Sequence, residues 1–286
     1  RLAKGDRSWL ARHMVQDRGS DGTRALVDFA YGAIRGWKNS EFDIEKNGEA
    51  MLLGRLGAFG PATVFDVGAN VGDWSLTALG ALPDARVHAF EIAPGTSVKL
   101  IERTRAAGER LTIKAIGLGA AEGEIELFYT PDSDTASSTV ASAMEVVAAN
   151  HGTRNVERLR VAVTTGDAYM RARGVDRIDF LKIDVEGAEL SVLEGFAQAF
   201  DRGAIDVVQF EYGLVNLRTR LFLEEFHAFF EARGFAVGKL LPHGVAFKTY
   251  ELTDEDFIGL NFVACRRARA DILEAIRCPP LSLPTG

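Results

Sequence analysis

The chain has 286 residues, of which 47% are hydrophobic and 26% are charged, as is typical of a globular protein that buries a large core. Its formal net charge of −7 excludes a broad basic surface for phosphates, so we expect a small-molecule or carbohydrate partner and no nucleic acid. Cys265 and Cys278 lack metal-ligand spacing, and no apolar run approaches the roughly 20 residues that span a bilayer, so we expect a cytoplasmic protein without a zinc site or an integral membrane segment.

Residues 1–60 predict an N-terminal helical extension. Between Leu26 and Trp37, apolar residues recur at a spacing that places them on one face of a helix. Such a stripe requires a partner, so we expect the helix to pack on the core, with a lid over the substrate as the alternative. Because the chain begins with Arg1, we expect it to be processed or trimmed.

Residues 61–265 predict a doubly wound α/β domain. Several of its short apolar runs are apolar at nearly every position, which is typical of strands covered by helices on both faces and favours a mostly parallel sheet. The runs are TVFDV, RVHAFEI, LTIKAI, EIELFY, RIDFLKID, IDVVQFE, FAVGKLL and LNFVAC.

Three segments depart from this alternation. The run GEIELFYT, from Gly123, follows LTIKAI after a short spacer and predicts a local antiparallel pairing. Pro131 to Thr139 predict a polar loop. Residues 266–286 predict a basic surface helix followed by a Pro-rich tail.

The segment VFDVGANVGDW, residues 64–74, predicts a strand that runs through a glycine turn into a helix. Gly68 and Gly72 allow the backbone to approach a ligand, and the start of the helix offers free N–H groups. The spacing is not GxGxxG, and Asp66 precedes the first glycine. A carboxylate there would repel a pyrophosphate but attract an ammonium group, which favours S-adenosylmethionine over a dinucleotide.

Glu91 ends the second predicted strand, nineteen residues after Gly72. A carboxylate at this strand end can accept both ribose hydroxyls of a nucleoside, and Ile92 beside it can pack on an adenine. We therefore expect both residues to bind the cofactor.

The segment FLKIDVEGAEL, residues 180–190, predicts a buried strand with acids at its carboxyl end, where ligands bind in open α/β sheets. Glu189 is explained by the helix dipole, and Lys182 by pairing with a neighbouring acid. Asp184 and Glu186 are the candidates to bind an ammonium, hold a substrate hydroxyl or remove its proton. Glu211 ends the run VVQFE and is a further candidate.

Together, DVGANVG, the strand-end FE and FLKIDVEGAE resemble the FkbM family of S-adenosylmethionine-dependent methyltransferases over about residues 48–264, including a Ser-rich loop at residues 135–138. The resemblance implies a Rossmann-like class I methyltransferase with a mostly parallel seven-stranded sheet. It also implies an O-methyltransferase acting on sugars of glycolipids or polysaccharides, or on natural products. The implied cofactor contacts are Asp66, Gly68, Asn70, Gly72 and Glu91, with Asp184, Glu186 and Glu211 near the acceptor.

Two other functions stay open, a nicotinamide-dependent oxidoreductase and a non-catalytic cofactor-binding module. A divalent metal on Asp184, Glu186 and Glu211 also stays open, although no metal site is predicted. Neither the acceptor nor the oligomeric state follows from the sequence.

Overall fold

A computed structural model of the chain describes residues 12, 14, 16–130, 133–138, 144 and 156–279. Its largest element is an eight-stranded sheet in the order β11-β10-β12-β9-β8-β1-β2-β3. These strands are β1 (Thr63–Val67), β2 (Arg86–Phe90), β3 (Leu111–Lys114), β8 (Ile178–Ile183), β9 (Ile205–Glu211), β10 (Phe235–Leu241), β11 (Gly244–Phe247) and β12 (Asn261–Arg266). Five strands, β9-β8-β1-β2-β3, run parallel, and the pairings of β12, β10 and β11 are antiparallel.

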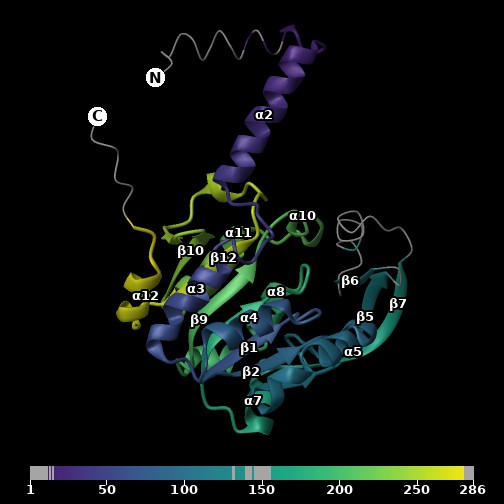
Figure 1. Ribbon diagram of the computed structural model, residues 1–286, viewed down its shortest axis with the longest axis vertical. Coiled ribbons are helices and arrows are strands. Elements are labelled where there is room, and N and C mark those ends of the chain that lie inside the picture. Colours follow the sequence, from purple (N-terminus) through teal and green to yellow (C-terminus); the bar gives the residue numbers. More distant parts are fainter. Residues whose placement is uncertain are drawn as a thin grey trace.

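Helices cover both faces of this sheet, which confirms the doubly wound α/β prediction (Figure 1). Neighbouring strand residues alternate between the faces, so Val64 packs with one layer and Phe65 with the other. One layer contains α3 (Glu49–Leu56), α4 (Asp73–Ala81) and α12 (Ala270–Ile276). The other contains α7 (Gly166–Arg173), α8 (Glu189–Glu194), α9 (Ala197–Asp201) and α11 (Leu223–Glu231). The two-sided burial explains why the strand segments are so continuously apolar.

The predicted number of seven strands is too small by one. All seven are present, and β11 adds an eighth through a hairpin with β10. The turn between them contains Pro242 and His243, and only four residues of β11 follow it. The strand is apolar throughout but only four residues long, so it did not stand out in the sequence as a separate strand.

A second sheet, in the order β4-β7-β5-β6, corrects two further predictions. Its strands are β4 (Gly117–Leu118), β5 (Gly123–Thr130), β6 (Ser133–Ser138) and β7 (Glu157–Thr164). The run GEIELFYT does pair antiparallel, but with β7 and β6 rather than with the preceding LTIKAI run. Residues predicted as a polar loop form β6 at the sheet edge, where pairing with β5 requires no apolar pattern.

The helix α2 (Asp21–Trp37) extends away from the rest of the chain (Figure 1). None of its residues is buried, so the prediction that its apolar stripe packs on the core is wrong. Its end is fixed, however, because Lys38 forms an ion pair with Asp256 at 2.7 Å and the buried Asn39 side chain donates hydrogen bonds to two backbone carbonyls. The apolar face of α2 therefore has no partner within the described part of the chain.

The remaining helices connect these layers. They are α5 (Pro94–Arg103), α10 (Asn216–Thr219) and the short 3-10 helices η1 (Gly57–Phe59), η2 (Arg105–Arg110) and η3 (Leu252–Asp254). The predicted C-terminal helix is present as α12, but it is less superficial than expected, because Ile272 and Ile276 are buried against the core. Among the described residues, no helix is long and apolar enough to cross a membrane.

Candidate active site

The chain order of the sheet reverses between β1 and β8. From β1 the chain continues outward through β2 and β3, and it later returns to place β8 and β9 on the other side of β1. In open α/β sheets this reversal leaves a crevice at the carboxyl ends of the strands, where ligands bind. A cavity of about 690 Å³ lies there, lined by the ends of β1, β2, β8 and β9 and by residues of the second sheet.

The backbones of β1 and β8 touch at the floor of this cavity. Gly68 has φ +83°, and a Cβ added to it would lie 1.7 Å from the carbonyl oxygen of Asp184. Only glycine therefore permits the turn after β1 to lie against the end of β8. Gly72, with φ +94°, has a different role from the one predicted, because it packs against Leu100 and Thr104 instead of lining the cavity.

Glu91 is fixed at the cavity by the backbone. One carboxylate oxygen accepts the N–H of Asn70 and the other accepts the N–H of Ala93, both at 2.8 Å. Burial raises the pKa of Glu91 to about 7, although these two hydrogen bonds oppose the shift. Ile92 also lines the cavity, and so does Asn70, whose side-chain oxygen is buried without a hydrogen-bond partner among the described residues.

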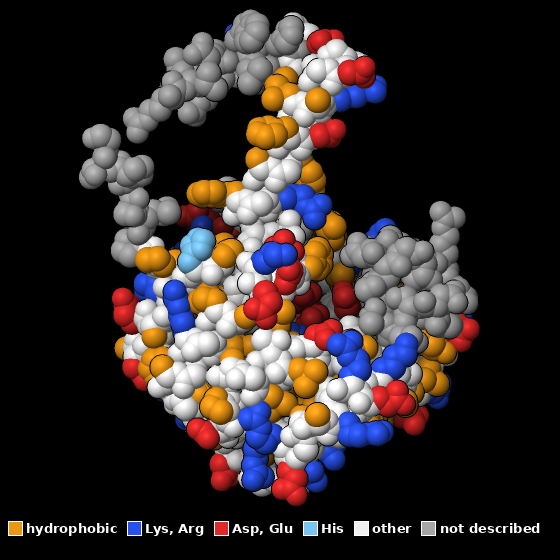
Figure 2. Space-filling model, viewed as in Figure 1, with side chains coloured by type: hydrophobic (Ala, Val, Ile, Leu, Met, Phe, Trp, Pro, Cys, Tyr) orange, Lys and Arg blue, Asp and Glu red, His pale blue; other side chains and the backbone are white. Residues whose placement is uncertain are grey.

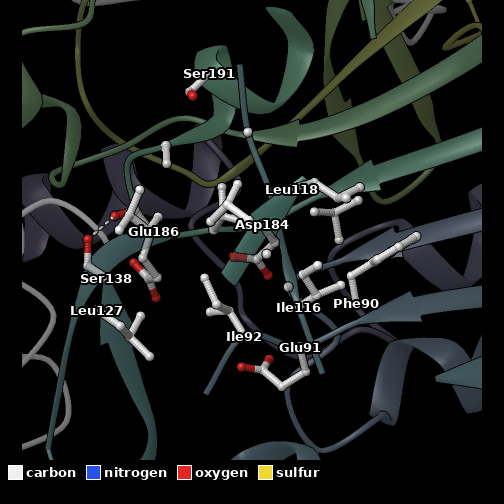
Figure 3. Close-up of a pocket in the computed structure, with 18 of the residues that line it drawn as sticks. Phe90, Glu91, Ile92, Ile116, Leu118, Leu127, Ser138, Asp184, Glu186 and Ser191 are labelled. Atoms are coloured by element: carbon white, nitrogen blue, oxygen red, sulfur yellow. Dashed lines mark hydrogen bonds between the residues drawn. The ribbon is translucent and has the colours of Figure 1, made fainter. Parts of the chain in front are cut away.

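Three acids from two other strand ends face the same cavity. Asp184 and Glu186 follow β8 (Figure 3), and Glu211 ends β9. Burial, with the nearby charges of Asp184 and Glu189, raises the pKa of Glu186 to about 8. Burial, with Asp184 and Glu186 as neighbours, also raises the pKa of Glu211 well above its usual value. The structure thus brings together the three acids that the sequence proposed for the acceptor.

A buried lysine lies beneath this acidic surface. The ammonium of Lys182 is 3.0 Å from an oxygen of Asp184 and 3.5 Å from an oxygen of Asp66. Burial alone would lower the pKa of Lys182, but Asp184 and Asp66 raise it above its usual value. Lys182 therefore carries the positive charge that balances Asp66 and Asp184.

The position of Asp66 corrects the expected direct contact with a cofactor ammonium. Its side chain is fully buried, does not line the cavity, and accepts a hydrogen bond from the Ser75 hydroxyl at 2.6 Å. Burial raises the pKa of Asp66, and Lys182 opposes the shift. Asp66 therefore contacts the site only indirectly, through Lys182, which also pairs with Asp184.

Glu189 and Ser138 shape the loop after β8. The Glu189 carboxylate accepts the N–H groups of Val185 and Gly187, which fits the structural role predicted for it. The Ser138 hydroxyl donates to the carbonyl of Glu186, as the dashed line in Figure 3 marks. Glu186 has φ +54°, so this hydrogen bond supports an uncommon backbone conformation.

Several cavity residues carried no clear signal in the sequence. They include Phe42, which follows α2, and the small residues Gly117, Gly119, Ala120 and Ala121. A cluster of small residues after an apolar run was the one available sign that the backbone approaches a ligand there. Of the proposed Ser-rich loop, residues 135–137 have side chains outside the described residues.

The ionisable residues described in the cavity wall are all acidic. Glu91, Asp184, Glu186 and Glu211 line it, and none of the described lining residues is basic. Within the described residues, no three His, Cys, Asp or Glu side chains form a group that could hold a metal ion. A ligand with positive charge and hydroxyl groups suits this wall better than a pyrophosphate does.

Comparisons with known proteins agree with this geometry. The sequence profile of the methyltransferase FkbM domain matches residues 66–237. The chain is 32% identical over 162 residues to the methyltransferase sdnD of Sordaria araneosa, a match that covers 46% of this chain and 59% of the relative. It is 28% identical over 155 residues to the hexuronic acid methyltransferase AglP of Haloferax volcanii, covering 53% of this chain and 56% of the relative.

Among solved structures, an FkbM methyltransferase from Methylobacillus flagellatus matches with a TM-score of 0.46 and 16% identity. The match covers 72% of this chain and 44% of that one. The chain thus spans less than two thirds of each of these three proteins.

Proposed function

Because the chain belongs to the FkbM family of methyltransferases, we propose that it transfers a methyl group from S-adenosylmethionine to a hydroxyl oxygen of a sugar or natural product. The observation that carries this proposal is the cavity wall, with four carboxylates and no basic residue among those described. A donor that carries an ammonium and a sulfonium suits such a wall, whereas the pyrophosphate of a nicotinamide dinucleotide would find no basic residue among the described lining to balance its charge. This charge and the family both disfavour the oxidoreductase alternative.

Glu91 and Ile92 are proposed to hold the nucleoside part of the donor. Both Glu91 oxygens are already oriented by backbone N–H groups, and each retains a lone pair for a ribose hydroxyl. Ile92 presents an apolar side chain on the same cavity wall. The unpartnered oxygen of Asn70 can accept one further hydrogen bond from the donor.

Asp184 is proposed to accept the proton of the acceptor hydroxyl. The pKa of Glu186, raised to about 8, favours its protonated form near neutral pH, and burial shifts the pKa of Glu211 in the same direction, which suits both residues to hydrogen-bonding the acceptor. Asp184 is ion-paired with Lys182 and lines the same cavity as these two acids. S-adenosylmethionine supplies an electrophilic methyl carbon when it is bound. The residues around the cavity then align the hydroxyl and exclude water, which typically contributes about 7–11 kcal/mol.

Titration calorimetry and a labelled-methyl assay test this function. We expect S-adenosylhomocysteine to bind at least about tenfold more tightly than NAD, because the acidic wall disfavours the pyrophosphate. We also expect transfer of labelled methyl to hydroxyl groups of glycolipid or polysaccharide extracts. Tighter binding of NAD would contradict the donor. Binding of S-adenosylhomocysteine without transfer to any hydroxyl acceptor would instead support the non-catalytic module.

The affinity for S-adenosylhomocysteine should depend on pH through Glu91. Its pKa of about 7 in the free protein means that lowering the pH from 8 to 6 protonates it and removes an acceptor for the ribose hydroxyls. We expect the affinity to fall by up to about tenfold per pH unit below pH 7. Glu91→Gln should bind more weakly and show a flatter pH profile, whereas Glu186→Gln should keep the Glu91-dependent decrease. An unchanged profile in Glu91→Gln would show that another group causes it.

A further inference from the structure

The exposed side chains of α2 form a surface that the transfer reaction does not use. Six large apolar residues of this helix are exposed, with Phe29 and Trp37 at 74% and 77%. The others are Leu26, Val27, Tyr31 and Ile34. Figure 2 shows hydrophobic side chains along the helix where it extends from the body. Leaving this much apolar surface in water is unfavourable, so α2 requires a partner.

The distribution of these residues around α2 indicates what kind of partner fits. At about 100° per residue, the six apolar side chains spread over about 200° of the helix circumference. The charged residues Asp21, Arg24, Asp28 and Arg35 are confined to about 60° on the opposite side. An apolar stripe that faces one packed partner need be only about 100° wide, so a single neighbouring helix would leave part of this arc in water. A fluid lipid surface covers the whole arc.

The residue types within the apolar arc also favour a lipid surface. Tyr31 and Trp37 carry polar atoms on aromatic rings, which suits them to the boundary between lipid and water. The helix has 17 residues and carries charges along its length, so it can lie in a membrane surface but is too short and too polar to cross it. Two acids and two arginines leave the polar side balanced, which makes insertion independent of lipid charge.

The fixed end of α2 links this surface to the cavity. The ion pair of Lys38 with Asp256 and the hydrogen bonds of Asn39 hold the base of the helix on the body. Three residues after Asn39, Phe42 is 69% exposed and also lines the cavity. Phe42 therefore places an exposed apolar side chain at the cavity, close in sequence to the end of α2.

We propose that α2 docks the protein on a lipid surface by inserting its apolar arc into the headgroup boundary. Docking through α2 brings the rim of the cavity, marked by Phe42, close to that surface. The docking itself does not depend on the proposed methyl transfer, because neither the donor nor the acids at the cavity take part in it.

Vesicle flotation of the full chain tests this proposal. We expect it to float with neutral phosphatidylcholine vesicles and equally with vesicles containing one fifth phosphatidylglycerol, with little effect of salt. The double variant Phe29→Ser, Trp37→Ser should reduce the bound fraction at least about tenfold, because two large apolar side chains are lost from the inserted face. Ile101→Ser on α5, which is 50% exposed, serves as the matched control and should bind as the wild type does.

Three results would overturn the docking proposal. The first is the absence of vesicle binding by a chain that still binds S-adenosylhomocysteine, which leaves the proposed function intact. The second is a dimer in light scattering that the double variant converts to monomers, because α2 would then be covered by a second copy. The third is binding restricted to the anionic vesicles and abolished by salt, since that would be charge-driven attachment. Unchanged thermal melting of the double variant confirms that it folds.

Discussion

Asp184→Asn is expected to lower kcat by about 10²–10⁴-fold, the range for losing a positioned general base. The substitution keeps the shape of the side chain and removes its ability to take the hydroxyl proton. Affinity for S-adenosylhomocysteine should stay within about threefold of the wild type, because Glu91 and the turn after β1 remain in place. Single-turnover methyl transfer and titration calorimetry measure the two quantities separately.

One control variant and two contrary outcomes test this prediction. Glu194→Gln changes an exposed carboxylate on α8 and should leave both quantities unchanged. If instead Asp184→Asn abolishes binding of S-adenosylhomocysteine, Asp184 holds the donor rather than the proton. An unchanged kcat would assign the base to Glu186 or Glu211.

Lys182→Met is expected to lower the free energy of unfolding by about 3–5 kcal/mol, the usual cost of removing one partner from a buried ion pair. The Lys182 side chain is only 7% exposed, and its loss leaves the fully buried Asp66 without the ammonium group that stabilises its charged form. Denaturant unfolding at pH 7 measures the change. Adding Asp66→Asn to Lys182→Met should recover part of the loss, because it removes the buried carboxyl group that the lysine no longer stabilises.

Lys46→Met is the matched control for this prediction. Lys46 forms an ion pair with Asp43 at 2.6 Å, but its side chain is 70% exposed and solvent screens the pair, so the substitution should change the free energy of unfolding far less than Lys182→Met does. A Lys182→Met protein as stable as the Lys46→Met control would mean that Asp66 and Asp184 do not require the lysine. The same conclusion would follow if adding Asp66→Asn destabilised the Lys182→Met protein further.

The main sheet was predictable because burial on both faces leaves a strong pattern. All seven runs assigned to it are strands, and runs such as FAVGKLL and LNFVAC contain a single polar residue each. The second sheet was harder to predict because its pairings depend on distant partners. The first four residues of β7 are exposed, so its sequence shows little of the alternation that identifies a strand.

The sequence predicted those residues of the candidate site that lie at the carboxyl ends of strands. Glu91, Asp184, Glu186 and Glu211 all end or follow strands, and the parallel arrangement brings these positions to one edge of the sheet. The role of Asp66 could not be predicted in this way, because the orientation of its side chain depends on where Lys182 and Ser75 lie in three dimensions. The exposure of α2 also had no sequence signal, since an apolar stripe looks the same whether or not the chain covers it.

The contact between Gly68 and the carbonyl of Asp184 has a consequence for how members of such a family diverge. The segment proposed to hold the donor and the strand end proposed to receive the proton share one rigid junction, so neither can shift without disturbing the other. Phe42 and the walls contributed by β5 and β6 lie outside that junction. New acceptors can therefore evolve through changes in these peripheral segments while the reacting centre stays constant.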